Sequence, residues 1–413
     1  MSTNSIQFQI LSEQSLINRE VPSQRILELQ IQSPKAGTTT NRSALNLAII
    51  IDKSGSMSGS RLEFAKQAAI FVTERLEAKD RVALIAFDDQ IEVLSPSILM
   101  VEENKKAIKQ KISEIRFGGT TNLGDGWLTG CQQIAEVSED TSINRALLLT
   151  DGHANVGMVD IEELSTHARE LAKRGISTST FGVGHGFNEH LLEAMSNQGR
   201  GNFYFIEAPM GIPDIFLNEF KELSSITAAD VEIELEIPNQ VSYEILGGWA
   251  HEVKEKKLTI FVGNLFSEQS LEVYIKLLTP PSDTAADLHI NGKIRAKYEN
   301  GQVLETASTL KFIYSDQQLV KSEPRKHDLL ERFATVELAD KTTAALKLER
   351  SGEREKASRI MNQTIMENMP YLSPEQATKY QDMSERMKRG MEERDRKTTQ
   401  YDSYREKRRR GEY

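Results

Sequence analysis

The sequence predicts an α/β fold: a doubly wound, mostly parallel, Rossmann-like sheet inserted in a β-sandwich and followed by a C-terminal α-helical region. Residues 44–223 alternate short apolar runs with amphipathic helical patterns, the order expected of a parallel sheet covered on both faces. Residues before and after that segment alternate apolar with polar side chains, which is typical of strands with one exposed face. From residue 321 onward, apolar residues recur at helical spacing.

Residues 1–43 are expected to form strands of the sandwich, with the clearest alternation over residues 24–31 and a polar connector at residues 34–43. The central segment, 44–223, carries the main strand candidates and ends in a helix expected at residues 212–223. Those candidates are residues 45–51, 82–87, 146–150, 177–183 and 202–206, with 91–94 as an antiparallel edge.

Residues 224–320 return to an antiparallel β pattern, with strands expected at residues 231–237, 258–262, 271–278 and 293–298. The simplest architecture that fits this pattern combines these strands with residues 1–43 in one sandwich, although two separate β units would also fit the sequence. Residues 321–396 predict a helical hairpin or bundle, whose last helix opens with the capping box Ser373-Pro374-Glu375-Gln376. The charged residues 397–413 predict a frayed helix or a disordered tail, or else a basic contact for an acidic partner or RNA.

Composition narrows the classes of function. A formal net charge of −10 argues against bulk binding of nucleic acid. The only cysteine, Cys131, excludes an internal disulfide, and its helical apolar surroundings predict a buried, inert thiol, which suits a reducing compartment. No apolar run approaches the ~20 residues of a membrane-spanning helix, and the polar start lacks a secretion signal. We therefore expect a soluble, cytoplasmic protein.

The run Asp52-Lys53-Ser54-Gly55-Ser56 follows the first strand candidate of the central segment. Asp52, Ser54 and Ser56 stand at alternate positions and can point one way from a turn. Carboxylate and hydroxyl oxygens are hard ligands that suit Mg²⁺, Mn²⁺ or Ca²⁺ rather than zinc or copper. Without a metal, the same residues would serve as ordinary turn and N-cap residues.

Two further loops share this chemistry: Gly118-Gly119-Thr120-Thr121-Asn122 opens a helical pattern, and Thr150-Asp151-Gly152 closes a strand. Together the three loops resemble the von Willebrand factor type A (VWA) domain. The family's metal-ion-dependent adhesion site (MIDAS) has Asp-x-Ser-x-Ser, a distant Thr and a more distant Asp. The resemblance, to VWA proteins of the intracellular bacterial type, implies a complete site. Inter-α-trypsin inhibitor heavy chains also flank this domain with β-rich segments.

The threonine is chosen by register, because family members usually place a small and then an apolar residue at the fifth and sixth positions after it. From Thr121 these positions are Gly126 and Trp127, whereas from Thr120 they are Asp125 and Gly126. Thr121 is therefore the predicted ligand and Thr120 the alternative.

An EF-hand loop is the other metal-binding interpretation, since Asp52, Ser54, Ser56 and Glu63 fall at its ligand positions. Met57 stands where that loop requires glycine, and a strand rather than a helix is expected before Asp52. The EF-hand interpretation is therefore disfavoured.

The resemblance implies that Ser54, Ser56 and Thr121 contact Mg²⁺, while Asp52 and Asp151 often act through water. A position on the ion stays open for an Asp or Glu of a partner. We therefore expect a scaffold or adaptor, not an enzyme, and intracellular relatives often work with ring-shaped ATPases or multi-component assemblies.

Two other classes of function stay open. One is a metal-dependent hydrolase, for which the sequence offers only His153, Asp88 and Asp89 as weak candidates for proton transfer. The other is a structural subunit without metal-mediated binding.

Overall fold

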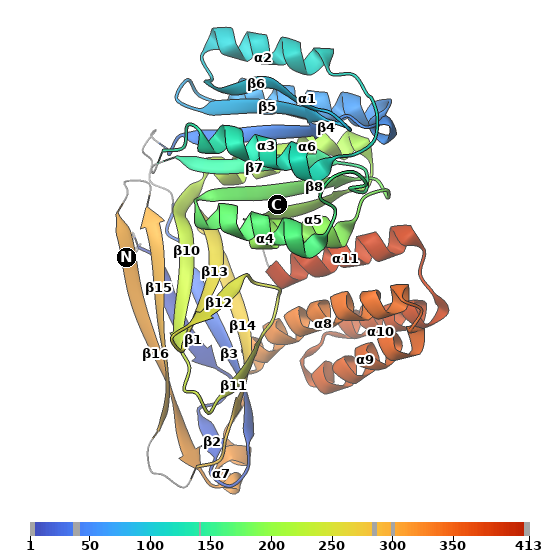
Figure 1. The fold of residues 1–413 in the computed structure, drawn as a ribbon. Helices are drawn as coiled ribbons and strands as arrows, with labels where there is room; N and C mark the ends of the chain where they lie inside the picture. The colour runs from blue at the N-terminus through green and yellow to red at the C-terminus, as the bar shows by residue number, and fades with distance from the viewer. Residues whose placement is uncertain (1–4, 36–41, 140–141, 283–286, 299–301, 409–413) are drawn as a thin grey trace.

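Three β-sheets and a group of helices build this chain, seen here in a computed structural model (Figure 1). The structure describes residues 5–35, 42–139, 142–282, 287–298 and 302–408. One sheet belongs to the central segment, two sheets form the sandwich below it in Figure 1, and the C-terminal helices lie beside both.

The central sheet has the order β6-β5-β4-β7-β8-β9. Every neighbouring pair is parallel except β5 and β6, which confirms the predicted mostly parallel sheet with an antiparallel edge. Its strands are β4 (Leu45–Asp52), β5 (Arg81–Phe87), β6 (Ile91–Leu99), β7 (Ile143–Thr150), β8 (Ile176–Val183) and β9 (Arg200–Ile206). Its helices are α1 (Ser60–Arg75), α2 (Glu102–Glu114), α3 (Leu123–Ala135), α4 (Ile161–Lys173), α5 (Glu189–Gln198) and α6 (Ile212–Ser224).

Side chains of the central strands alternate between two cores, one on each face of the sheet. In β4, Leu47 and Ile49 pack with α1 and α6, whereas Ala48 and Ile50 pack with α3 and α5. Burial on both faces explains why the residues from Leu47 to Ile51 form a continuous apolar run rather than an alternating one. Cys131 is buried in the second core, as predicted, and its burial raises the pKa of the thiol.

The sandwich contains strands from both sides of the central segment. One sheet has β1 (Gln7–Ser12), β3 (Ser23–Gln32), β14 (Ser270–Thr279) and β11 (Ser242–Ile245). The other has β12 (His251–Lys254), β13 (Lys257–Phe266), β10 (Ile226–Glu236), β15 (Leu288–Tyr298), β16 (Val303–Ser315) and β2 (Leu16–Asn18). Strand β3 pairs with β14 along its whole length, and one core joins Leu29 of β3 to Ile233 of β10. The β segments therefore form one unit.

The C-terminal helices are α7 (Gln317–Ser322), α8 (His327–Arg350), α9 (Arg354–Asn368), α10 (Pro374–Arg389) and α11 (Glu393–Arg408). The predicted capping box opens α10: Ser373 Oγ accepts from Gln376 N at 3.1 Å, and Gln376 Oε1 accepts from Ser373 N at 3.0 Å. None of the described helices has the length and apolar character needed to cross a membrane.

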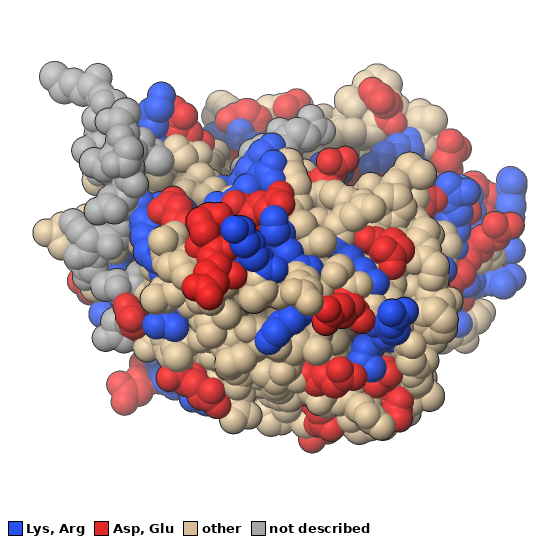
Figure 2. Space-filling model, turned by 90° about the horizontal axis from the view of Figure 1, so that it is seen from above, with Lys and Arg blue, Asp and Glu red and all other residues tan. Residues whose placement is uncertain are grey.

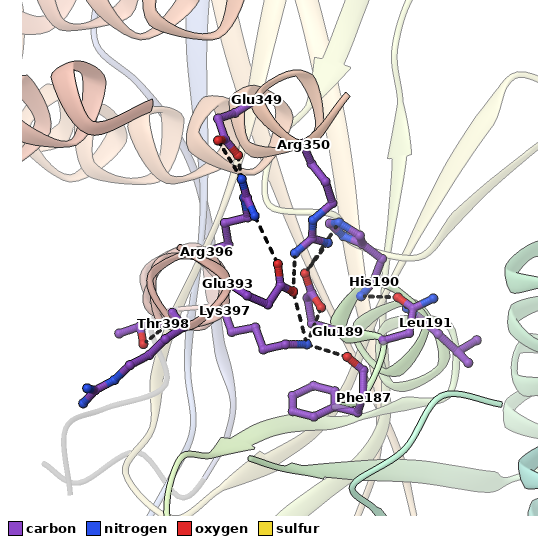
Figure 3. A network of polar contacts seen from close by, with 12 residues as sticks. Phe187, Glu189, His190, Leu191, Glu349, Arg350, Glu393, Arg396, Lys397 and Thr398 are labelled. Atoms are coloured by element: carbon purple, nitrogen blue, oxygen red, sulfur yellow. Dashed lines mark hydrogen bonds and ion pairs between the residues drawn. The ribbon is translucent and has the colours of Figure 1, made fainter. Parts of the chain in front are cut away.

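The prediction of a frayed or disordered tail is wrong for residues 397–408. They belong to α11, which lies between α5 and the bundle of α8, α9 and α10 (Figure 1). Lys397 is 2% exposed, and its Nζ donates to Glu189 Oε2 of α5 at 2.8 Å (Figure 3). Lys407 Nζ donates to Glu193 Oε1 of α5 at 3.1 Å. Buried acids on α5 compensate the charges of α11, which composition alone did not reveal. Arg409 and Arg410 lie outside the described residues.

The same network reaches α8 (Figure 3). Arg350 Nη1 lies 2.5 Å from Glu189 Oε1, and Arg396 Nε donates to Glu349 Oε2 at 2.6 Å. Ion pairs therefore connect α5, α8 and α11 around Glu189.

Acidification should weaken the docking of α11. Burial of Glu189 raises its pKa, but the hydrogen bond and charge of Lys397 outweigh that effect and hold the pKa at about 2, below the ordinary 4.5. The stabilisation is therefore complete above pH ~4.5 and lost as pH falls toward 2. Trp249 should report the loss by fluorescence, because the Arg408 guanidinium lies 3.9 Å from its ring. Glu189→Gln should show a smaller change in this window, and an identical pH profile would contradict the prediction.

Charges of both signs are interspersed on the face seen from above the view of Figure 1 (Figure 2). On that face, outside the grey atoms, no broad area of Lys and Arg gathers of the kind that holds nucleic-acid phosphates.

Candidate metal site

Asp52 and Asp151 lie at the carboxyl ends of the neighbouring parallel strands β4 and β7, the edge of the sheet where the sequence predicted a ligand site. Ser54 and Ser56 follow Asp52 in a tight turn that includes the 3-10 segment Gly55–Met57. Ser56 Oγ donates to Asp151 Oδ1 at 2.7 Å, and the Oγ atoms of Ser54 and Ser56 lie 3.2 Å apart. The structure therefore brings both predicted acids and both serines together.

Thr121 joins this group, and Thr120 does not. Thr121 is 3% exposed, whereas Thr120 is exposed. A methyl group built on Gly152 would lie 3.1 Å from Thr121 Oγ1, 3.6 Å from Ser56 Oγ and 3.9 Å from Asp52 Oδ2. Three predicted ligand oxygens therefore surround one glycine, where a larger residue would crowd them. The Thr121 hydroxyl therefore lies near Ser56 and Asp52, and its role as a metal ligand stays a prediction.

Backbone hydrogen bonds fasten the three loops to one another. Gly118 N donates to Lys53 O at 2.7 Å, and Gly55 N donates to Gly119 O at 2.9 Å. Thr121 N donates to Asn155 Oδ1 at 3.0 Å, so the loop after Asp151 holds the threonine in place.

Lys53 and Asp88 add a buried ion pair to this arrangement. Lys53 Nζ lies 2.6 Å from Asp88 Oδ2, which also accepts from Gly119 N at 3.0 Å. A methyl group on Gly118 would lie 1.9 Å from the same oxygen, so only glycine allows this approach. Asp88, one of the weak catalytic candidates, is therefore engaged in holding two loops together.

The two acids of the site are buried: Asp52 is 0% exposed and Asp151 1%. Burial raises the pKa of Asp52 to about 6, and the negative charge of Asp151 adds to the shift. Hydrogen bonds from Ser54 N at 2.8 Å and from Thr150 Oγ1 at 2.5 Å oppose it. Two neighbouring buried carboxylates favour a nearby cation.

The donor set fits a hard divalent ion. Two carboxylates and three hydroxyls converge, all of them oxygen ligands. Within the described ranges, no group of three or more His, Cys, Asp or Glu side chains is placed to hold a metal. His153, two residues after Asp151, is exposed.

Sequence reasoning assigned no supporting role to four features of the site: Arg61, Thr150, Asn155 and the ion pair of Lys53 with Asp88. Arg61 Nη1 donates to Asp151 Oδ2 at 2.5 Å and to Ser56 O at 2.9 Å. These contacts join residues up to 98 positions apart, as between Thr150 and Asp52, and no local pattern encodes them.

Comparison with known proteins identifies the central segment. The family model for the von Willebrand factor type A domain matches residues 46–218. An uncharacterized protein of Synechocystis is 28% identical over 307 residues, which cover 70% of each chain. Human inter-alpha-trypsin inhibitor heavy chain H3 is 28% identical over 162 residues, and this chain spans only 18% of its length. The Escherichia coli protein YfbK is 30% identical over 195 residues, 34% of its length.

Two solved structures share the fold over nearly the whole chain. A von Willebrand factor type A protein from Catenulispora acidiphila has a TM-score of 0.76, with 16% identity and 96% of each chain covered. The ArnB paralog VWA2 from Sulfolobus acidocaldarius has a TM-score of 0.69, with 16% identity and 98% coverage of each chain. The sandwich and the C-terminal helices therefore recur with the central sheet, and residues 46–218 of this chain are a von Willebrand factor type A domain.

Proposed function

We propose that this chain is a scaffold or adaptor that binds an acidic side chain of a protein partner through a divalent ion, foremost Mg²⁺, with Mn²⁺ or Ca²⁺ as alternatives. VWA domains commonly mediate protein–protein interaction. The observation that carries the proposal is the convergence of Thr121 Oγ1, Ser56 Oγ and Asp52 Oδ2 around Gly152, beside the second buried carboxylate, Asp151.

In this proposal Ser54, Ser56 and Thr121 hold the ion, with Asp52 and Asp151 beside them. An ion held mainly by neutral hydroxyls keeps much of its positive charge and attracts a carboxylate. Thr150 and the backbone of Ser54 orient Asp52 by hydrogen bonds. Because Ser56 is exposed while Asp52 is fully buried, a partner would approach from the side of Ser56.

A hydrolase is the second candidate, and the geometry favours it less. A general base must be free to take a proton. Asp88 is paired with Lys53, and among the described residues exposed His153 has no contact that would direct it toward the five oxygens. The third candidate is a structural subunit whose partners bind elsewhere.

We also propose a cytoplasmic location, and a ring-shaped ATPase or multi-component assembly as the partner, on the resemblance to intracellular VWA proteins.

Ion binding should depend on Thr121 and not on Thr120. Thr121→Ala removes a hydroxyl that faces Gly152, so we expect Mn²⁺ affinity to fall by about tenfold or more. Thr120→Ala, its matched control, should leave the affinity within twofold, roughly the scatter of such titrations. Isothermal titration calorimetry of the full chain with Mn²⁺ measures the affinity of each variant. Equal effects of the two substitutions would contradict the assignment.

Capture of partners from lysate then tests what the ion does. Immobilised protein should retain specific partners in excess Mg²⁺ and lose them both with a chelator and in Asp52→Ala. Partners retained under all these conditions would move the interaction to the sandwich or the helices and favour the structural subunit.

A further inference from the structure

We propose that Arg61 is a built-in cation that competes with the divalent ion for the Asp151 carboxylate and thereby sets how tightly the site binds that ion. This inference rests on the proposed function, because it concerns the same site. It adds a residue that lies outside the Asp-x-Ser-x-Ser, Thr and Asp pattern.

The contacts of Arg61 place its charge directly on the site. Nη1 donates to Asp151 Oδ2 at 2.5 Å and to Ser56 O at 2.9 Å. The other oxygen of Asp151, Oδ1, accepts from Ser56 Oγ at 2.7 Å. One guanidinium nitrogen therefore touches two of the five residues proposed to surround the ion.

Because the Asp151 carboxylate is buried, its negative charge depends on the ion pair with Arg61 for compensation. The Asp151 side chain is 0% exposed, so solvent cannot compensate its charge, whereas the Arg61 side chain is 38% exposed. Within the described residues, Arg61 is the ion-pair partner of Asp151. Asp52, the other buried acid, has hydrogen bonds from Thr150 and Ser54 instead. The guanidinium therefore supplies a positive charge to one specific acid.

The guanidinium also lies close to the turn after β8. Gly184, in the turn after β8, has a φ of +68°, and a methyl group built there would lie 3.4 Å from Arg61 Nη2. Arg61 thus lies between Asp151 and the Gly184 turn. Because Arg61 lies in the first turn of α1 and is partly exposed, its side chain can leave Asp151 without opening either core.

Competition follows from electrostatics. A guanidinium and a divalent ion on the same carboxylate repel each other, and each lowers the negative charge available to the other. Binding of the ion therefore requires Arg61 to share or release Asp151. An acidic partner group would pair with the released guanidinium, so ion and partner would strengthen each other's binding.

Titration of the full-length chain with Mn²⁺ tests the inference. Arg61→Gln removes the competing charge, and we expect Mn²⁺ to bind about fivefold tighter, the size expected for a partly exposed ion pair. Arg61→Lys keeps the charge but not the planar donor geometry, and should fall between Arg61→Gln and the parent. Arg75→Gln is the matched control, because Arg75 lies at the opposite end of α1 with its guanidinium 3.1 Å from the Phe71 ring. It should leave the affinity unchanged.

Each outcome decides the question. Tighter binding by Arg61→Gln alone, or Mn²⁺ binding by Arg61→Gln when the parent binds none, supports the inference. Equal or weaker binding by a folded Arg61→Gln, checked by Trp127 fluorescence, overturns it and leaves the proposed function standing. Absence of Mn²⁺ binding in the parent and in all variants overturns both.

Discussion

Lys397→Met should lower the free energy of unfolding by about 3 kcal/mol, because it removes one of the two cations that pair with the buried Glu189 carboxylate. The loss falls at the lower end of the range for broken buried ion pairs, since Arg350 still lies 2.5 Å from Glu189. Urea unfolding followed by Trp249 fluorescence measures it, because the docked Arg408 covers that ring.

The double variant Lys397→Met/Glu189→Gln separates the charge from the packing. Without the Glu189 charge, loss of the lysine should cost less, so the double variant should be more stable than the sum of the two single losses predicts. Strictly additive losses would show that Lys397 stabilises α11 through its aliphatic stem and not through this ion pair.

Glu219→Gln should destabilise the VWA domain by about 3–5 kcal/mol. Glu219 lies on α6, and its Oε1 is 2.8 Å from Arg145 Nη1 of β7, with the two side chains 1% and 2% exposed. Ser179 and Asn202 also donate to this carboxylate, at 2.6 and 2.7 Å. The substitution leaves the Arg145 charge buried without its counter-ion.

Fluorescence of Trp127 during urea unfolding reports this loss, because its ring is buried in the core on the other face of the same sheet. Asp214→Asn is the matched control, since Asp214 is an exposed acid on the same helix, and should change stability by less than about 0.5 kcal/mol. A loss for Glu219→Gln no larger than that of the control would mean that α6 is held by its apolar contacts alone.

Local sequence patterns were sufficient to predict a strand or loop wherever that element has a distinctive sequence. The continuous apolar run of β4 predicted a strand buried on both faces, and the structure has it. Strand β16 (Val303–Ser315) was not predicted, because every second residue from Val303 to Ile313 is exposed and the opposite face mixes apolar residues with Thr306 and Ser308. It is held in the sheet by backbone pairing with β15, which carries no side-chain signature.

By itself the sequence determined the α/β order, and it predicted five oxygen-bearing residues on three loops, Thr121 among them, because each inference depends on a few neighbouring positions. Only the tertiary structure decided where charges pair. The contact of Arg61 with Asp151 and that of Lys397 with Glu189 join residues far apart in the chain. A charged side chain looks solvated in sequence. Whether it is buried depends on an opposite charge that the fold brings to it, and this pairing turned the predicted tail into α11 and placed a cation on the proposed metal site.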